Sequence, residues 1–366
     1  MNPVLFVTGH AHAYRVGALA RLHEREGIEL ALFGGRYKHG GAGFAQEVPF
    51  PHRQVRPREL FALAGGGDYR AVVCSTGGRL ALLATWAGAR RGRVPLILWA
   101  SLWAHPRSAV HTLSYLPLRR LYRSADAVVT YGPHVSAYVR SRGARNVFVA
   151  AQSVDNDFWS ARASPPSLRD WPTSADTRFL FVGRDAREKG VAVLIEAWRQ
   201  AELPAPANAL VLVGAGMGAT AFAPAGLRRN GDAAIVSLDA VAPSELRDIY
   251  AASDALVLPS IPTRTFREPW GLVINEAMNR GLAVVASDAV GAVAGGLVRH
   301  DVNGLVVPAG DSTALAVAMR RLAGDPALRA RLGRQAAEDV RAYSHDAWAQ
   351  GFSEALASVG LARGRW

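Results

Sequence analysis

Cysteine and long apolar runs are both scarce in this chain of 366 residues. The single cysteine, Cys74, excludes a disulfide framework within the chain, which suits a reducing compartment, and we interpret it as a small buried residue. No run reaches the roughly 18–20 apolar residues of a membrane span. The N-terminal MNPVLFVTGH lacks the basic stretch of a signal peptide and predicts a first strand. We therefore expect a cytoplasmic protein that meets a membrane, if at all, peripherally at its inner face.

Lysine is the other scarce residue, since only Lys38 and Lys189 stand among 42 basic residues. This preference for arginine is typical of a GC-rich coding bias, so a position that keeps lysine indicates a need for a compact point charge. The net charge of +12 lies entirely in the first half: residues 1–165 hold 21 Lys and Arg against 9 Asp and Glu, and residues 166–366 hold 21 of each. This asymmetry predicts an anionic partner for the first half.

Short apolar segments and amphipathic segments alternate along the chain, which predicts an α/β fold. Residues 3–9, 28–35 and 94–100 are typical of buried strands, with helical spacing over 14–27 and 78–92. A stretch rich in Pro, Ser and Asp at 160–177 interrupts the pattern, which then starts again with a strand over 178–183. Two successive Rossmann-like domains with doubly wound parallel sheets follow from this order, with ligands expected at the carboxyl ends of the strands. We place the N-terminal domain at 1–162, the linker at 163–177, the C-terminal domain at 178–345 and a terminal helix at 346–366.

The segment FVGRDAREKG, residues 181–190, ends a strand and begins a helix. Arg184 and Lys189 stand on either side of an acidic loop. Two cations beside a helix N-terminus can hold a diphosphate, because the helix N–H groups also favour negative charge. The alternative is a solvated turn.

The segment REPWGLVINEAMNRG, residues 267–281, places Glu268 on a loop and Glu276 in the helix that begins near Gly271. Such carboxylates can accept hydrogen bonds from sugar hydroxyls, while free N–H groups at the helix start meet a phosphate. The alternative is that one carboxylate caps the helix and the other is a solvent-exposed helical residue without a role in binding.

Residues 179–311 closely resemble the C-terminal domain of glycosyltransferase family 4, whose members are retaining enzymes of the GT-B fold. The landmarks are GRDAREKG, LVLVGAG, ELRDIYAASDALVLPS, EPWGLVINEAMNRGLAVVASD and NGLVVPAGD, in that order. The resemblance implies two Rossmann-like domains facing each other across a donor and acceptor cleft, with the terminal helix crossing back to the first domain. It implies transfer of a hexose-type sugar from a UDP- or GDP-sugar without a metal or other cofactor.

The same resemblance implies the roles of individual residues. Arg184 and Lys189 would contact the donor diphosphate, Glu268 would hold the transferred sugar, and Glu276 would bind the ribose hydroxyls. The amides of Gly271 and Leu272 would face phosphate. The catalytic set is thus Glu268, Arg184 and Lys189.

The N-terminal half departs from the family pattern in two places that matter for the site. TGHAHAYRVG lacks the usual paired glycines, which weakens the case for Gly9 as a donor contact. The family histidine has no clear counterpart in WASLWAHPRS: His105 is a candidate for the acceptor side, with Ser101 or Trp103 as alternatives for its position.

The first half should bind the acceptor, which we expect to be a glycan, a glycolipid or a lipid-linked molecule of cell-surface or natural-product biosynthesis. Two segments combine arginine with apolar residues, which suits an anionic membrane surface, although a solvated arginine face is an equal alternative. They are Arg53, Arg56 and Arg58 with Leu60 and Phe61, and Arg119, Arg120 and Arg123 in HTLSYLPLRRLYRSA.

Three other functions compete with a transferase. No nucleic-acid-binding module is present despite a pI near 10.6, so we expect no nucleic-acid partner. A nucleotide-sugar epimerase or phosphorylase shares the architecture, but the spacing of Arg184, Lys189, Glu268 and Glu276 argues against it. A non-catalytic relative that binds nucleotide sugars stays open.

Overall fold

The computed structural model describes residues 2–34, 47–166, 168, 171–214 and 235–360. Lys38 lies outside these ranges. The chain divides into two compact units, residues 1–155 with 343–366, and residues 156–342. We describe each unit separately.

The first unit is built on a parallel sheet with the strand order β3-β2-β1-β4-β5-β6-β7. Its central strands are mostly apolar and buried on both faces, as in β1 with VLFVT, because helices cover both sides of a parallel sheet. The strands are β1 Val4–Thr8, β2 Ile28–Leu32, β3 His52–Gln54, β4 Ala71–Ser75, β5 Leu96–Ala100, β6 Ala127–Thr130 and β7 Val147–Val149. The helices are α1 Ala13–Glu26, η1 Pro57–Glu59, α2 Leu60–Gly65, α3 Arg79–Gly92, α4 Ala109–Ser124, α5 Pro133–Ser141 and α13 His345–Ser358.

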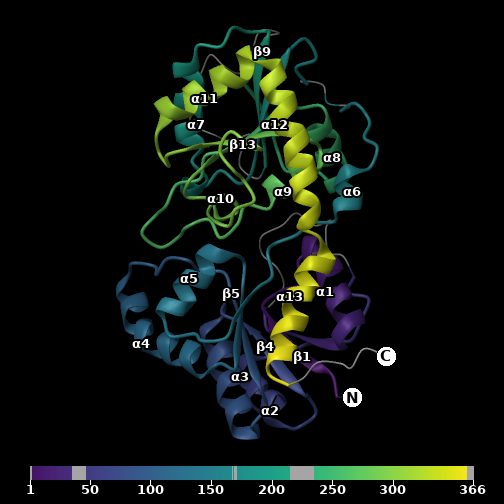
Figure 1. The fold of residues 1–366 in the computed structure, drawn as a ribbon, viewed down its shortest axis with the longest axis vertical. Helices are drawn as coiled ribbons and strands as arrows, with labels where there is room; N and C mark the ends of the chain where they lie inside the picture. The colour runs from purple at the N-terminus through teal and green to yellow at the C-terminus, as the bar shows by residue number, and fades with distance from the viewer. Residues whose placement is uncertain (1, 35–46, 167, 169–170, 215–234, 361–366) are drawn as a thin grey trace. The chain divides into compact units, whose positions relative to one another are not determined.

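Helix α13 belongs to the first unit although it comes at the end of the chain, and Figure 1 shows it beside α1. Trp348 and Phe352 of this helix pack against Phe6 and Trp99 of the sheet, with ring centroids 5.6–6.4 Å apart. The hydroxyl of Ser344 accepts a hydrogen bond from a backbone N–H of the first turn and caps the helix. The sequence places this helix at 346–366; it ends at residue 358, and residues 361–366 lie outside the described ranges.

The second unit has a parallel sheet with the order β10-β9-β8-β11-β12-β13. Figure 1 shows α7 and α11 side by side on this unit. Its strands are β8 Thr177–Val182, β9 Asn208–Val213, β10 Ile235–Leu238, β11 Ala255–Leu258, β12 Ala283–Ser287 and β13 Gly304–Val307. Its helices are α6 Asn156–Ser160, η2 Arg187–Lys189, α7 Val191–Ala201, α8 Pro243–Ala251, α9 Val273–Asn279, α10 Gly291–Ala294, α11 Ser312–Gly324, α12 Pro326–Asp339 and η4 Val340–Ala342.

The units divide at 155/156, whereas the sequence places the linker at 163–177. The reason is α6, which is fixed to the second unit by hydrogen bonds. The amide of Asn279 donates to Asn156 at 2.9 Å, and Arg280 donates to the carbonyl of Trp159 at 3.1 Å. A Pro- and Ser-rich composition therefore marks a surface segment here and not the boundary itself.

Candidate donor site in the second unit

Strands β8 and β11 lie side by side at the centre of the second sheet, where the strand order reverses. From β8 the chain moves outward through β9 and β10, and from β11 it moves outward through β12 and β13. In open parallel sheets ligands bind outside the carboxyl ends of the strands at such a switch point. Gly183 and Arg184 follow β8, and Pro259 and Ser260 follow β11.

Lys189 is positioned by a close approach between the loops that follow these two strands. Gly190 has φ of 72°, and a Cβ at this position would lie 2.1 Å from the carbonyl oxygen of Pro259, so only glycine fits. The backbone N–H of Ile261 donates to the carbonyl of Glu188 at 2.9 Å. These contacts hold Lys189, the last residue of η2, next to the end of β11.

Lys189 and Glu268 form a salt bridge across these loops. The Nζ of Lys189 donates to Oε2 of Glu268 at 2.6 Å, and the hydroxyl of Ser260 donates to the same oxygen at 3.3 Å. Glu268 is only 7% exposed, and its backbone carbonyl accepts a hydrogen bond from Gly291 at 3.1 Å. A carboxylate this buried needs both a positive partner and hydrogen bonds, and it has both.

Arg184 lies at the same strand end but is held much more loosely. Its side chain is 60% exposed and pairs with Glu188, four residues along the chain, at 3.5 Å. Such an exposed pair contributes little stability. The guanidinium can therefore leave Glu188 for an incoming anion at small cost.

The turn before α9 is a tight one. Gly271 has φ of 94°, and a Cβ there would lie 2.8 Å from Cδ2 of Leu258. Its carbonyl accepts a hydrogen bond from Ile274 at 2.9 Å. No backbone acceptor for the amides of Gly271 and Leu272 occurs within the described ranges, as is usual for the first residues of a helix.

Glu276 lies in α9 and is partly buried against α8. The hydroxyl of Tyr250 donates to its Oε2 at 2.8 Å. Burial raises the pKa of Glu276 from 4.5 to about 7, although the hydrogen bond from Tyr250 acts in the opposite direction. The structure thus brings Lys189 and Glu268 into contact with each other, whereas Glu276 contacts a different partner.

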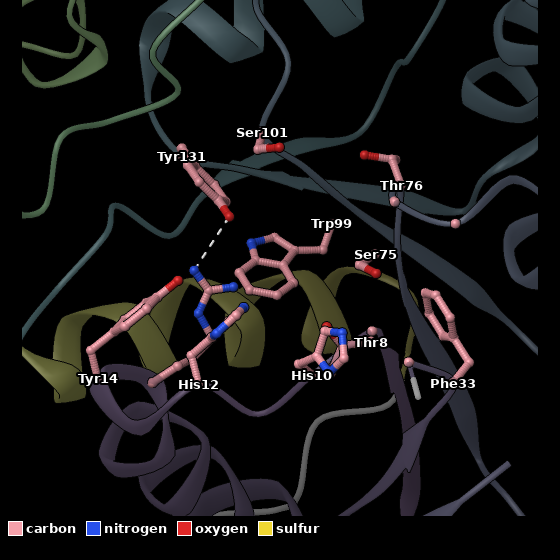
Figure 2. A pocket seen from close by; sticks show the side chains of 15 residues that line it. Thr8, His10, His12, Tyr14, Phe33, Ser75, Thr76, Trp99, Ser101 and Tyr131 are labelled. Atoms are coloured by element: carbon pink, nitrogen blue, oxygen red, sulfur yellow. Dashed lines mark hydrogen bonds between the residues drawn. The ribbon is translucent and has the colours of Figure 1, made fainter. Parts of the chain in front are cut away.

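Gly9 lines a pocket of about 410 Å³ in the first unit, at the carboxyl ends of β1, β4 and β5, which Figure 2 shows from close by. Ser101 also lines this pocket. His105 does not: its Nδ1 lies 3.2 Å from the hydroxyl of Tyr138, and its ring lies edge-on to Tyr115. Of the three positions that the sequence leaves open, His105, Ser101 and Trp103, Ser101 is therefore the one that lines the strand-end pocket.

The two arginine-rich segments of the first unit differ in their surroundings. Arg53 is paired with Glu29, and Leu60 is completely buried, so only Phe61 offers an exposed apolar side chain in that segment. By contrast, Leu116 of α4 is 69% exposed. It lines a groove of about 440 Å³ together with Arg90, Arg119, Arg120, Arg123 and Ser124. Within the described part of the chain no carboxylate lies within 4.0 Å of these four arginines.

Two features are absent from the part of the chain that the structure describes. None of the helices there has the length and apolar character to cross a membrane. No group of three or more His, Cys, Asp or Glu side chains comes together there as a metal site.

The sequence interpretation missed the partners of the predicted residues. Ser260 closes the motif ALVLPS, and Tyr250 lies in ELRDIYAAS, so both were within recognised landmarks. The apolar residues around Ser260 and Tyr250 predict a strand and a helix, but they do not indicate that these two side chains contact Glu268 and Glu276. Ser260 meets Glu268 through the path of the chain after β11, and Tyr250 meets Glu276 through the packing of α8 against α9.

Known proteins resemble this chain both in sequence and in structure. Residues 171–339 match the model of the family Glycosyl transferases group 1, which covers most of the second unit. A lipopolysaccharide core biosynthesis glycosyltransferase, LpsD of Rhizobium meliloti, is 33% identical over 228 residues, 60% of each chain. A D-inositol 3-phosphate glycosyltransferase of Streptomyces avermitilis is 34% identical over 184 residues, 46% of this chain and 36% of that one. The matches thus span about three fifths or less of these relatives.

Solved structures match the whole length. HepE of Anabaena, solved with UDP and glucose, has a TM-score of 0.74 at 21% identity, over 98% of this chain and 100% of that one. A glycosyltransferase of Rickettsia africae has a TM-score of 0.77 at 15% identity, over 98% of both chains. With its two parallel-sheet units, the chain has the GT-B fold, as predicted. Over residues 171–339 the chain is similar to the glycosyltransferases of group 1, which is the part of the predicted resemblance that these matches support.

Proposed function

We propose that this protein is a retaining glycosyltransferase of family 4 that transfers a hexose-type sugar from a nucleotide diphosphate sugar to a hydroxyl group of an acceptor. The observation that carries the proposal is the contact between Lys189 and Glu268 at 2.6 Å at the switch point of the second sheet. A buried carboxylate can accept hydrogen bonds from sugar hydroxyls, and the ammonium group beside it can meet a phosphate.

Each side chain has a role in this reaction. Glu268 orients the sugar, Lys189 and Arg184 bind the diphosphate, and Glu276 accepts hydrogen bonds from the ribose. The bond between the sugar C1 and the diphosphate oxygen breaks, and the acceptor hydroxyl oxygen bonds to C1 on the same face. The hydroxyl proton passes to the departing diphosphate, whose added negative charge Lys189 and Arg184 stabilise.

The donor we propose is a UDP-sugar. HepE, which shares the fold, was solved with UDP and with UDP-glucose, and this likeness supports uridine over guanosine. GDP-sugars are the alternative donors. The two cations at the diphosphate supply the charge that a divalent metal supplies in other transferases, so we propose that no metal is required.

We propose that the acceptor is a glycan, a glycolipid or a lipid-linked molecule, and that the protein meets an anionic membrane surface. Charge supports α4 as the docking site, because Arg119, Arg120 and Arg123 have no carboxylate partner within the described ranges and flank the exposed Leu116. Arginine beside exposed leucine is suited to an anionic lipid surface. The segment around Arg53 is less suitable because Glu29 already neutralises it.

A panel of nucleoside diphosphates and their sugars tests the donor assignment by thermal shift and calorimetry. We expect UDP to raise the melting temperature of the wild type and to bind the Lys189→Met variant much more weakly. A flat panel for the wild type would overturn the donor site. Consumption of the sugar nucleotide distinguishes an enzyme from a non-catalytic relative. Release of UDP without formation of an epimerised sugar nucleotide distinguishes a transferase from an epimerase.

A further inference from the structure

The pocket at the carboxyl ends of β1, β4 and β5 is organised around the guanidinium of Arg15. Figure 2 shows the rings of Tyr14, Trp99 and Tyr131 gathered around the hydrogen bond that Arg15 donates to the hydroxyl of Tyr131. Arg15 lies in the first turn of α1, directly after the loop that leaves β1. None of the roles assigned above uses this residue.

Neutral groups hold Arg15 in place. One of its terminal nitrogens donates to Oε1 of Gln152 at 2.7 Å and to the hydroxyl of Tyr131 at 3.4 Å. Its Cζ lies 4.3 Å from the ring centroid of Trp99 and 5.3 Å from that of Tyr14. Stacking on the rings fixes the plane of the guanidinium. Its other two nitrogens make no hydrogen bond to a described residue, which leaves donors for a ligand.

No carboxylate neutralises this charge within the part of the chain that the structure describes. Among the described residues, the pocket lining contains no Asp or Glu, and no salt bridge involves Arg15. The ionisable groups that interact with its charge include Tyr14, Tyr131 and His12. Burial, together with the charge of Arg15, lowers the pKa of His12 to about 4, so His12 is neutral at neutral pH. A partly buried cation without a counterion favours an incoming anion.

The rest of the lining suits a small polyhydroxylated molecule. Thr8, Ser75, Thr76 and Ser101 supply hydroxyl groups, and the aromatic rings supply apolar faces. A volume of about 410 Å³ is within the range of small-molecule sites. The indole N–H of Trp99, a buried donor, also has no acceptor among the described residues.

We infer that this pocket binds the acceptor through an oxyanion: the polyhydroxylated unit of the acceptor that enters the pocket carries a phosphate or a carboxylate, which the guanidinium of Arg15 holds. The inference rests on the proposed transferase function, because it names the chemistry of the molecule that receives the sugar. Every residue that lines the pocket belongs to the first unit, whereas Lys189, Glu268 and Glu276 belong to the second, and Gly9 is the predicted donor contact that the pocket includes.

Calorimetry on the full chain with glucose 6-phosphate, glucuronate and glucose tests the inference. We expect at least one of the two anions to bind the wild type more tightly than glucose, and the tighter one identifies phosphate or carboxylate as the oxyanion. Arg15→Gln should weaken that binding about ten- to a hundredfold, because a charge-assisted bidentate contact is lost. Arg15→Lys keeps the charge but not the planar guanidinium, so its affinity for the anion should lie between those of the wild type and Arg15→Gln. This second variant also keeps the test decisive if Arg15→Gln fails to fold.

Arg25→Gln is the matched control, because Arg25 lies on the same helix but is paired with Asp346 at 3.0 Å. Arg25→Gln should bind the anions as tightly as the wild type does. If it lost as much affinity as Arg15→Gln, the effect would come from surface charge in general, and the inference would be overturned. Equal binding of glucose and both anions would also overturn it. UDP binding should be unchanged in Arg15→Gln and lost in Lys189→Met, so failure of the donor site is recognised separately. Displacement of the anion by UDP would assign the pocket to the donor instead and overturn the inference.

Discussion

The ammonium nitrogen of Lys189 lies 2.6 Å from Oε2 of Glu268, although 79 residues separate them in the chain. One partner follows β8 and the other follows β11, and these strands are neighbours in the sheet. The pair ties the residue expected to hold the sugar to a residue expected to bind the diphosphate. A substitution of either residue should therefore change both the stability of the second unit and its affinity for the donor.

Lys189→Met should lower both the free energy of unfolding and the affinity for UDP, because it leaves Glu268 buried without its cation. The double variant Lys189→Met/Glu268→Gln should recover stability but not turnover. Chemical denaturation of the wild type, both single variants and the double variant should give a coupling free energy of about 1–3 kcal/mol.

Arg184→Gln is the control for this cycle, since its side chain is 60% exposed. We expect weaker UDP binding with unfolding changed by less than about 0.5 kcal/mol. Wild-type UDP affinity in Lys189→Met would contradict the assigned role of Lys189.

Glu276 should make stability and nucleotide binding depend on pH near neutrality. Its pKa is about 7 in the folded protein against 4.5 for the free side chain, so the folded state holds the proton more tightly than the unfolded state. The contribution of Glu276 to stability is therefore greatest below about pH 4.5, falls as pH rises and is lowest above about pH 7. UDP affinity should rise as pH passes through about 7, the pKa of Glu276 in the folded protein, because the charged carboxylate is the better acceptor for ribose hydroxyls. Glu276→Gln should remove both trends, as thermal unfolding and calorimetry from pH 5 to 8 would report.

Tyr250→Phe provides the matched test of this assignment. In the wild type the hydroxyl of Tyr250 donates to Glu276 at 2.8 Å and thereby lowers the pKa of the carboxyl group. Its removal should raise that pKa, so the midpoints of both pH profiles should move upward. An unchanged midpoint in this variant would show that another group titrates.

Gly271→Ala should destabilise the second unit and weaken UDP binding. Its φ of 94° is strained for any residue with a Cβ, and that atom would lie 2.8 Å from Leu258. We expect a loss of about 1–3 kcal/mol in the free energy of unfolding. Gly324→Ala is the control, because nothing lies within 4 Å of its Cβ position at the end of α11, and it should be neutral or slightly stabilising. Equal effects of the two substitutions would contradict the strain argument.

Vesicle flotation tests the docking surface on α4. The wild type should float with anionic vesicles and not with neutral ones, and replacement of Arg119, Arg120 and Arg123 by Gln should abolish the difference. The matched triple replacement of Arg53, Arg56 and Arg58 should have a smaller effect, because Glu29 already compensates Arg53. No flotation of the wild type with either lipid would sink the docking proposal.

Chelation of divalent metals should leave turnover unchanged. In the proposed reaction Arg184 and Lys189 stabilise the departing diphosphate, so EDTA in the assay should have no effect. Loss of activity with EDTA and recovery with Mg²⁺ would contradict this part of the proposal.

The amino-acid sequence by itself determined the α/β class and the local position of the donor residues. Apolar strand segments such as VLFVT and the turn residue Gly271 act through short-range physics, since burial patterns and backbone conformation are encoded within a few residues. The family resemblance added roles for Lys189, Glu268 and Glu276 because it depends on the same local motifs.

Only the tertiary structure decided which side chains meet. The partners of Glu268 and Glu276 come from other strands and helices, and Arg15 reaches Gln152 over 137 residues. Strand order sets these distances, and it depends on how whole helices pack on the sheet, which a periodic pattern along the chain does not contain. The boundary at residues 155/156 was likewise decided by the hydrogen bonds of Asn156 and Trp159 with the second unit, against the composition of the segment that follows.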